Sequence, residues 1–186
     1  IAAYDEKTCT LLYRVVGAGT LEMSEVKAGD TINVLGPLGQ GFKIDQLPEQ
    51  SEVLLVGGGI GVAPLYQLAR LLHEANHTVT SVLGFADKDD VYYKEQFEAL
   101  GKVIITTDDG SMGVKGHVGH GAQGITPEAV FACGPTPLLK FVQNQYADLD
   151  HVYLSLEERM ACGIGACHAC DTKKKDISIF NLMVCL

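Results

Sequence analysis

Short apolar runs alternate with helix-like stretches between residue 51 and about residue 150, and this alternation limits the possible folds more than any other feature. Residues 52–56 form an apolar run with the length of a buried parallel strand. Leu65, Leu68 and Leu72 recur at i, i+3 and i+7, which predicts a helix over residues 62–75. Further strands are predicted at residues 78–85, 103–107, 129–133 and 152–155, and further helices at residues 92–100 and 136–146. We therefore predict an α/β fold built on a doubly wound parallel sheet.

The beginning of the chain has a different pattern. Residues 8–16 and 31–35 are rich in β-branched and aromatic side chains and are separated by Gly-rich turns, so both are predicted strands. Short strands of this kind are typical of a small all-β barrel or sandwich. The polar residues 46–50 form the predicted connector, and we expect a domain boundary after residue 48.

A glycine-rich turn joins the first buried strand to the first helix. Gly57, Gly58, Gly59 and Gly61 lie where the pyrophosphate of a dinucleotide binds in α/β proteins, because glycines permit close backbone approach and the helix N-terminus supplies N–H donors. The strict G-x-G-x-x-G fingerprint is not met, since Val62 takes the last position. A tight turn without a ligand is the alternative.

A second candidate lies at the end of a later strand, in Cys133, Gly134 and Pro135. This is the edge of a parallel sheet at which open α/β folds bind ligands. Taken alone, Cys133 is more typical of a small buried hydrophobe than of a functional thiol.

Four cysteines near the end of the chain follow the spacing C-x4-C-x2-C-x14-C: Cys162, Cys167, Cys170 and Cys185. The first three match the start of the plant-type [2Fe–2S] pattern, in which thiolates bind the iron atoms. Structural zinc is one alternative, since C-x2-C is a common zinc half-site. Disulfides are the other; they would need an oxidising compartment, and the N-terminal residues shown do not have the charged-then-apolar pattern of a signal segment.

Composition limits the remaining possibilities. The net charge of −9, without a basic stripe, argues against a nucleic-acid surface. No apolar stretch approaches the roughly 20 residues that span a bilayer, so a cytoplasmic protein is the default expectation. The chain starts with Ile1 rather than Met and ends one residue after Cys185, so we expect a segment of a longer polypeptide.

Three motifs together resemble a known family. Residues 57–64 (Gly-Gly-Gly-Ile-Gly-Val-Ala-Pro) and 133–135 (Cys-Gly-Pro), in this order and spacing, resemble the ferredoxin-NADP reductase superfamily. With the cysteine loop added, essentially the whole chain is similar to the electron-transfer subunits of class B dihydroorotate dehydrogenases. The resemblance implies a partial FAD-binding β-barrel (residues 1–48), an NAD-binding domain (49–154) and a small [2Fe–2S] domain (155–186).

The resemblance also implies roles for residues. The glycine turn faces the pyrophosphate of NAD, and residues 133–135 lie beside the nicotinamide near the flavin. The segments that contact FAD contain Leu12, Tyr13, Arg14, Gly19 and Thr20. The family also has an Arg-Pro-x-Ser-Ile segment that clamps the flavin, of which this sequence shows only the final Ile, as Ile1. We therefore hypothesise that the chain binds FAD weakly or not at all.

By the same resemblance, electrons pass between NADH, FAD, the [2Fe–2S] cluster and the FMN of a partner dehydrogenase that oxidises dihydroorotate, in a heterotetramer. This chain then holds no catalytic acid or base. Residues 84–90 are acidic and lack Arg, which favours NAD over NADP. The alternatives are a flavin reductase subunit of another ferredoxin or sulfide oxidoreductase, and a non-catalytic, zinc-stabilised nucleotide-binding module.

Overall fold

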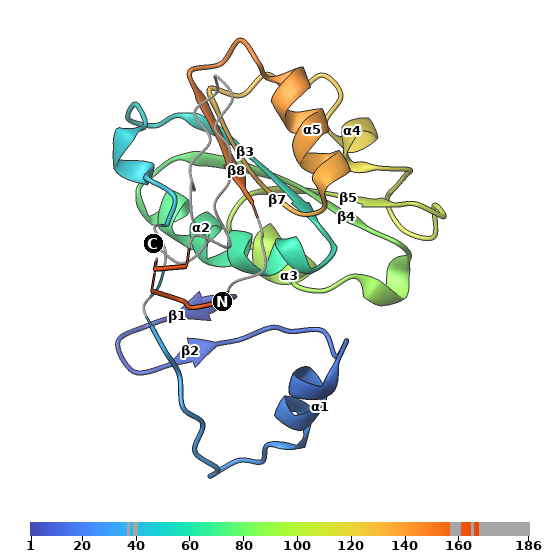
Figure 1. Ribbon diagram of the computed structural model, residues 1–186. Coiled ribbons are helices and arrows are strands. Elements are labelled where there is room, and N and C mark those ends of the chain that lie inside the picture. Colours follow the sequence, from blue (N-terminus) through green and yellow to red (C-terminus); the bar gives the residue numbers. More distant parts are fainter. Residues whose placement is uncertain (37, 39–40, 157–160, 165, 168–186) are drawn as a thin grey trace.

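The computed structural model describes residues 1–36, 38, 41–156, 161–164 and 166–167. In this part of the chain, a six-stranded sheet carries helices on both faces, and the N-terminal segment lies beside one of these helices (Figure 1). The strands are β1 (Ala3–Tyr4), β2 (Cys9–Thr10), β3 (Glu52–Gly58), β4 (Thr78–Phe85), β5 (Lys102–Thr107), β6 (Val114–Lys115), β7 (Ala129–Cys133) and β8 (His151–Ser155). The helices are α1 (Ala18–Glu25), α2 (Val62–Glu74), α3 (Lys94–Glu98), α4 (Val118–Gly121) and α5 (Thr136–Gln145), with short 3-10 turns η1 (Ile44–Gln46), η2 (Gly59–Gly61) and η3 (Lys88–Asp90).

The large sheet has the strand order β6-β5-β4-β3-β7-β8, and all of its pairs are parallel. Strand β3 is central, and the chain runs outward through β4 and β5 before it returns to β7 on the other side of β3. This reversal places a topological switch point between β3 and β7. The predicted doubly wound parallel sheet is confirmed.

Alternate residues of β3 point into two separate cores. Val53 and Leu55 pack with buried residues of α2 and α3, whereas Leu54 and Val56 pack with buried residues of α4 and α5. Because both faces of β3 are covered, its sequence after the exposed Glu52 is continuously apolar rather than alternating. The sheet therefore buries its centre completely and leaves its strand ends as the accessible edge.

Most of the predicted elements in this region are confirmed. Strands 78–85 and 129–133 have the predicted bounds, and helices α2 and α5 end one residue earlier than predicted. The predicted helix 92–100 is shorter, because Tyr93 has a left-handed φ of 59° and α3 begins only after it. Strand β6 and helix α4 were not predicted, since two and four residues are too few for a periodic pattern.

The N-terminal segment corrects two predictions. Strand 31–35 is wrong, because these residues are in neither helix nor strand, and strand 8–16 shrinks to Cys9–Thr10. Strands exist only as hydrogen-bonded ladders, and among the described residues of 1–48 the sole ladder is the β1–β2 pair. Residues 18–25 form helix α1 instead of a turn, and Thr20 Oγ1 accepts the N–H groups of Val16 and Gly17 at its start.

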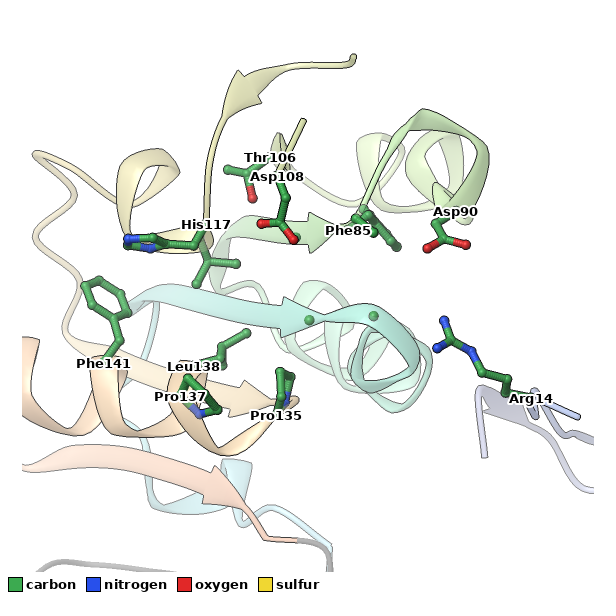
Figure 2. A pocket seen from close by; sticks show the side chains of 15 residues that line it. Arg14, Phe85, Asp90, Thr106, Asp108, His117, Pro135, Pro137, Leu138 and Phe141 are labelled. Atoms are coloured by element: carbon green, nitrogen blue, oxygen red, sulfur yellow. The ribbon is translucent and has the colours of Figure 1, made fainter. Parts of the chain in front are cut away.

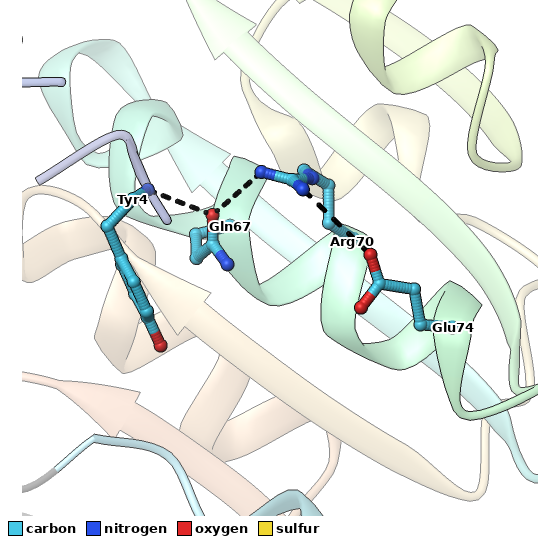
Figure 3. Close-up of polar contacts among 4 residues, drawn as sticks. All are labelled: Tyr4, Gln67, Arg70 and Glu74. Carbon is cyan, nitrogen blue, oxygen red and sulfur yellow. Dashed lines mark hydrogen bonds and ion pairs between the residues drawn. The ribbon is translucent and has the colours of Figure 1, made fainter. Parts of the chain in front are cut away.

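A polar contact between β1 and α2 helps to tie this segment to the sheet domain. Ala2 is fully buried, and the Tyr4 N–H donates to Gln67 Oε1 at 3.2 Å (Figure 3). The same oxygen accepts from Arg70 Nη1 at 3.3 Å, and Arg70 Nη2 lies 3.9 Å from Glu74 Oε1. Helix α2 thus presents a row of polar side chains to β1.

Within the described residues, the helices are all too short or too polar to cross a lipid bilayer.

Candidate functional site

A cavity of about 620 Å³ opens at the carboxyl edge of the sheet, beside the switch point. Open α/β sheets bind their ligands at this position. Figure 2 shows Arg14 and Asp90 at one end of the cavity and His117 and Phe141 at the other, with Pro135 between them. The cavity is long enough to contact residues of the N-terminal segment, the glycine turn and helix α5 together.

The four predicted glycines have two different reasons for lacking a side chain. A Cβ on Gly57 would lie 2.9 Å from Val62 Cγ2, and a Cβ on Gly58 would lie 2.6 Å from Leu138 Cδ1. A Cβ on Gly61 would lie 2.6 Å from the carbonyl carbon of Cys133, so the turn can pack against the end of β7 only as glycine. These three positions are fixed by packing of the strand, the helix and β7.

Gly59 is different, because a Cβ there would meet no atom within 4 Å. Its φ of 53° is left-handed, which favours glycine, and the residue lines the cavity. Gly58 also lines the cavity, whereas Gly57 and Gly61 are not among the described lining residues. The turn therefore offers open backbone to a ligand at Gly59, beside the packed Gly58 and shortly before the N-terminus of α2.

The residues of the predicted segment 133–135 likewise differ in whether they pack in the core or line the cavity. Cys133 is 1% exposed and packs in the core with β3 and α2, which confirms it as a buried apolar residue. Pro135 lines the cavity and starts helix α5 as its N-cap residue. Gly134 connects the two, and its Cβ position lies 3.1 Å from the Gly58 nitrogen. Segment 133–135 and the glycine turn thus meet at the switch point.

Thr106 lines the cavity and was not predicted as a site residue. Thr106 is fully buried, and its Oγ1 has no hydrogen-bond partner in the described part of the chain although the residue lines the cavity. Asp108, directly after β5, also lines the cavity and lies in residues 107–111, a segment that resembles the family's loop near the nicotinamide. An unsatisfied buried hydroxyl beside a cavity fits a polar ligand that would complete it. In the sequence, a polar residue directly after a predicted parallel strand is a pattern that indicates such a cavity-lining position.

No pattern in the sequence indicated that His117 and Phe141 would line the cavity. His117 is the N-cap of the unpredicted helix α4, and its Nδ1 accepts the N–H of Gly119 at 3.0 Å. Its ring lies 6.1 Å from that of Phe141 on α5. These two residues are brought together only by the packing of α4 beside α5.

Of the five residues expected to contact FAD, Arg14 alone is among those lining the cavity. Tyr13 is exposed and Leu12 is partly buried. Gly19 and Thr20 lie in the first turn of α1, where Thr20 also donates its hydroxyl to the Gly17 carbonyl at 3.0 Å. The structure therefore places a guanidinium at the mouth of the nucleotide-sized cavity, and a helix start further along the same segment.

The described part of the cysteine loop has features of a thiolate site. Cys162 Sγ accepts the N–H of Ile164 at 3.5 Å. This N–H, together with the backbone and side chain of Cys167, lowers the pKa of the Cys162 thiol to about 6. A thiol of this kind is ionised at neutral pH, as a ligand of iron must be.

Two of the four predicted cysteine ligands, Cys162 and Cys167, lie among the described residues. Cys170 and Cys185 lie outside the described residues, which contain no group of three or more side chains able to hold a metal ion. The two described cysteines nevertheless fit an iron–sulfur ligand set in their chemistry.

Comparison with known proteins first defines the class. Residues 55–144 match the family model "Oxidoreductase NAD-binding domain". A solved structure of an NADH-dependent reduced ferredoxin-NADP oxidoreductase superposes on 85% of this chain and 58% of that chain, with a TM-score of 0.74 and 37% identity. The cytochrome b5 reductase domain of Ulva prolifera nitrate reductase shares the fold, with a TM-score of 0.55 and 23% identity over 67% of this chain and 58% of that domain. The protein is an oxidoreductase component with a ferredoxin-NADP reductase-like fold.

The particular family follows from the remaining matches. Residues 157–186 match the model "Iron-sulfur cluster binding domain of dihydroorotate dehydrogenase B". The dihydroorotate dehydrogenase B (NAD(+)) electron transfer subunit of Streptococcus pneumoniae is 46% identical over 96% of this chain and 71% of its own length. The subunit of Enterococcus faecalis is 48% identical over 92% of this chain and 67% of its own length. The chain belongs to the family of dihydroorotate dehydrogenase B electron transfer subunits.

Proposed function

We propose that this chain passes electrons between NAD(H) and the FMN-containing catalytic subunit of a dihydroorotate dehydrogenase, with FAD and a [2Fe–2S] cluster as its cofactors. The observation that carries this proposal is the joint match of residues 55–144 and 157–186 within one family. A flavin, when bound, exchanges electron pairs with a nicotinamide and single electrons with an iron–sulfur centre. The chain's own residues bind and orient these groups.

The nucleotide site is proposed at the cavity of Figure 2. Gly59 offers open backbone to the pyrophosphate, and Gly57, Gly58 and Gly61 allow this turn to pack closely. Residues 133–135 are proposed beside the nicotinamide, where Pro135 lines the cavity.

A preference for NAD over NADP is supported by charge. Asp90 lines the cavity from η3, after β4, and Asp108 lines it from the end of the neighbouring β5. Arg14 is the sole Lys or Arg among the described lining residues. A ribose 2′-phosphate near either carboxylate would be repelled, whereas a 2′-hydroxyl can donate a hydrogen bond to one.

The FAD site is proposed on the N-terminal segment, with Leu12, Tyr13, Arg14, Gly19 and Thr20 as its contacts. Support comes from Arg14, whose guanidinium can pair with phosphate oxygens, and from the start of helix α1 at Gly19 and Thr20. We propose residues 1–48 as part of an FAD-binding barrel, 49–154 as the nucleotide-binding domain and 155–186 as the cluster domain.

The cluster ligands are proposed to be Cys162, Cys167, Cys170 and Cys185. Support comes from their spacing and from the ionised state of Cys162. We further propose a heterotetramer with the catalytic subunit, in the cytoplasm. Replacement of any one of the four cysteines by Ser should abolish the cluster, while Cys9→Ser should retain it. Iron and sulfide content of anaerobically purified protein measures this, and unchanged iron in Cys185→Ser would remove Cys185 from the ligand set.

Reconstitution tests the proposed reaction. The protein is mixed with the catalytic subunit of Enterococcus faecalis dihydroorotate dehydrogenase B, and dihydroorotate-dependent reduction of NAD is followed. We expect activity that requires both chains and is lost in Cys162→Ser. Absence of dihydroorotate-linked NAD reduction in a complex that retains iron and flavin would overturn the proposal.

A second candidate is favoured by one observation, the 37% identity to the NADH-dependent reduced ferredoxin-NADP oxidoreductase over 85% of this chain. In that case the chain would serve as a flavin reductase subunit of a different complex. Reduction of a ferredoxin by NADH, without any response to dihydroorotate, would favour this candidate over the first.

A further inference from the structure

The side chain of Tyr92, which lies outside the glycine turn in the sequence, makes a hydrogen bond to the backbone of the turn. Tyr92 lies between η3 and α3, and its hydroxyl donates to the carbonyl oxygen of Gly59 at 2.9 Å. The carbonyl oxygen of Ile60 is the next acceptor, at 3.3 Å. No other side chain in the described residues is recorded as hydrogen-bonded to these two carbonyls.

The two carbonyls that face the Tyr92 hydroxyl determine where the neighbouring backbone N–H groups of the turn point. In a trans peptide the N–H lies opposite the C=O. When the carbonyls of Gly59 and Ile60 face Tyr92, the N–H groups of Ile60 and Gly61 must face away from it. Helix N-termini bind phosphate through such unpaired N–H groups. Within the turn, the backbone N–H of Val62 also donates to these two carbonyls, so the Tyr92 hydroxyl adds a side-chain contact from a distant segment to a local backbone bond.

The segment that carries Tyr92 is itself fixed. Asp87 Oδ1 accepts the N–H groups of Asp89 and Asp90 at 2.8 and 3.2 Å, and the Lys88 N–H donates to Ser111 Oγ at 2.8 Å. These bonds set the path of the chain directly before Tyr92.

Aromatic packing fixes the phenol from the other side. The Tyr92 ring lies edge-on to Phe85, which lines the cavity, at 5.6 Å, and to Tyr93 at 5.5 Å. Tyr93 holds the left-handed φ of 59°, an unfavourable conformation for a bulky residue, and its ring packs on Tyr66 at 4.9 Å. The phenol is therefore held in place before any ligand arrives.

We propose that Tyr92 is a positioning residue that orients the glycine turn for the pyrophosphate of NAD(H). This inference rests on the proposed nucleotide site and assigns to it a residue outside the cavity lining. Burial raises the pKa of Tyr92 to about 12, an effect that the nearby N–H of Ala63 partly opposes, so the hydroxyl stays protonated and donates at every physiological pH.

The test compares Tyr92→Phe with Tyr93→Phe in the full chain bound to its cofactors and catalytic subunit. Both changes remove one hydroxyl and keep the ring, and that of Tyr93 makes no hydrogen bond to the described residues. We expect Tyr92→Phe to raise the Kd and the KM for NADH about fivefold with kcat nearly unchanged. With NADH bound, amide hydrogen exchange at Ile60 and Gly61 should be faster in the same variant than in the wild type. Tyr93→Phe should leave all of these quantities unchanged.

Three results would overturn the inference. Unchanged NADH affinity in Tyr92→Phe would show that the hydroxyl does not orient the turn. Equal weakening in both variants, with equally lowered melting temperatures, would assign the effect to stability of the aromatic group. Failure of the wild-type complex to bind NADH would overturn the proposed nucleotide site, and this inference with it, and so differs from the first two results.

Discussion

The sheet domain and the N-terminal segment are built from similar proportions of apolar residues but bury them very differently. Leu54, Leu55 and Val56 in β3 are fully buried, whereas Val16, Val34 and Leu35 are exposed by 78%, 74% and 65%. Helix α1 has no buried residue, and α2 has seven. The sheet domain therefore supplies its own core, whereas the segment is held by contacts to that domain, through β1 on α2 and through Phe42 on Phe131.

The largest expected effect tests the close packing at the switch point. Gly61→Ala would place a Cβ 2.6 Å from the carbonyl carbon of Cys133 and 2.7 Å from the nitrogen of Gly134, and backbone paired in a sheet cannot move aside. We expect the free energy of unfolding to fall by about 4 kcal/mol, as measured by urea denaturation. The matched control is Gly41→Ala in the N-terminal segment, where no atom lies within 4 Å and the expected change is below about 0.5 kcal/mol. Equal effects in both variants would contradict the comparison.

A smaller difference in the free energy of unfolding is expected between substitutions of two leucines, one in each region. Leu54→Ala deletes a fully buried side chain between β3 and α5, and should cost about 3 kcal/mol of unfolding free energy. Leu35→Ala removes a side chain that is 65% exposed, and should cost less than about 0.5 kcal/mol. Thermal unfolding followed by circular dichroism measures both. A loss in Leu35→Ala close to that in Leu54→Ala would mean that the segment has a core of its own.

The smallest expected effect concerns the link between the two regions. Gln67→Ala removes the acceptor of the Tyr4 N–H and should loosen the segment by about 1 kcal/mol, so that limited proteolysis within residues 5–36 becomes about fivefold faster. Glu74→Ala is the control, because it removes only the exposed ion pair with Arg70 on the same helix. If both variants were cleaved at the same rate, the Tyr4–Gln67 bond would not hold the segment.

The sequence predicted the sheet domain well because its signals are local. Apolar runs of strand length and the periodicity of residues 62–75 correctly predicted the central strands and α2. Strand 31–35 failed because β propensity describes residues that fit a ladder, and no ladder is available to them in the described segment.

The candidate site was predicted in part for the same reason. Gly58, Gly59 and Pro135 were found from the turn and strand-end patterns, and they line the cavity. His117 and Phe141 were missed, because only the packing of α4 against α5 brings them together. The hydrogen bond of Tyr92 to Gly59 spans 33 residues and leaves no pattern in the sequence.

Electron paramagnetic resonance tests the central proposal, electron transfer from a nicotinamide to the cysteine loop, most directly. The protein is purified anaerobically, saturated with FAD and mixed with NADH. We predict the rhombic signal of a reduced [2Fe–2S] cluster, and its absence in Cys162→Ser. A cluster that dithionite reduces but NADH does not would contradict the account.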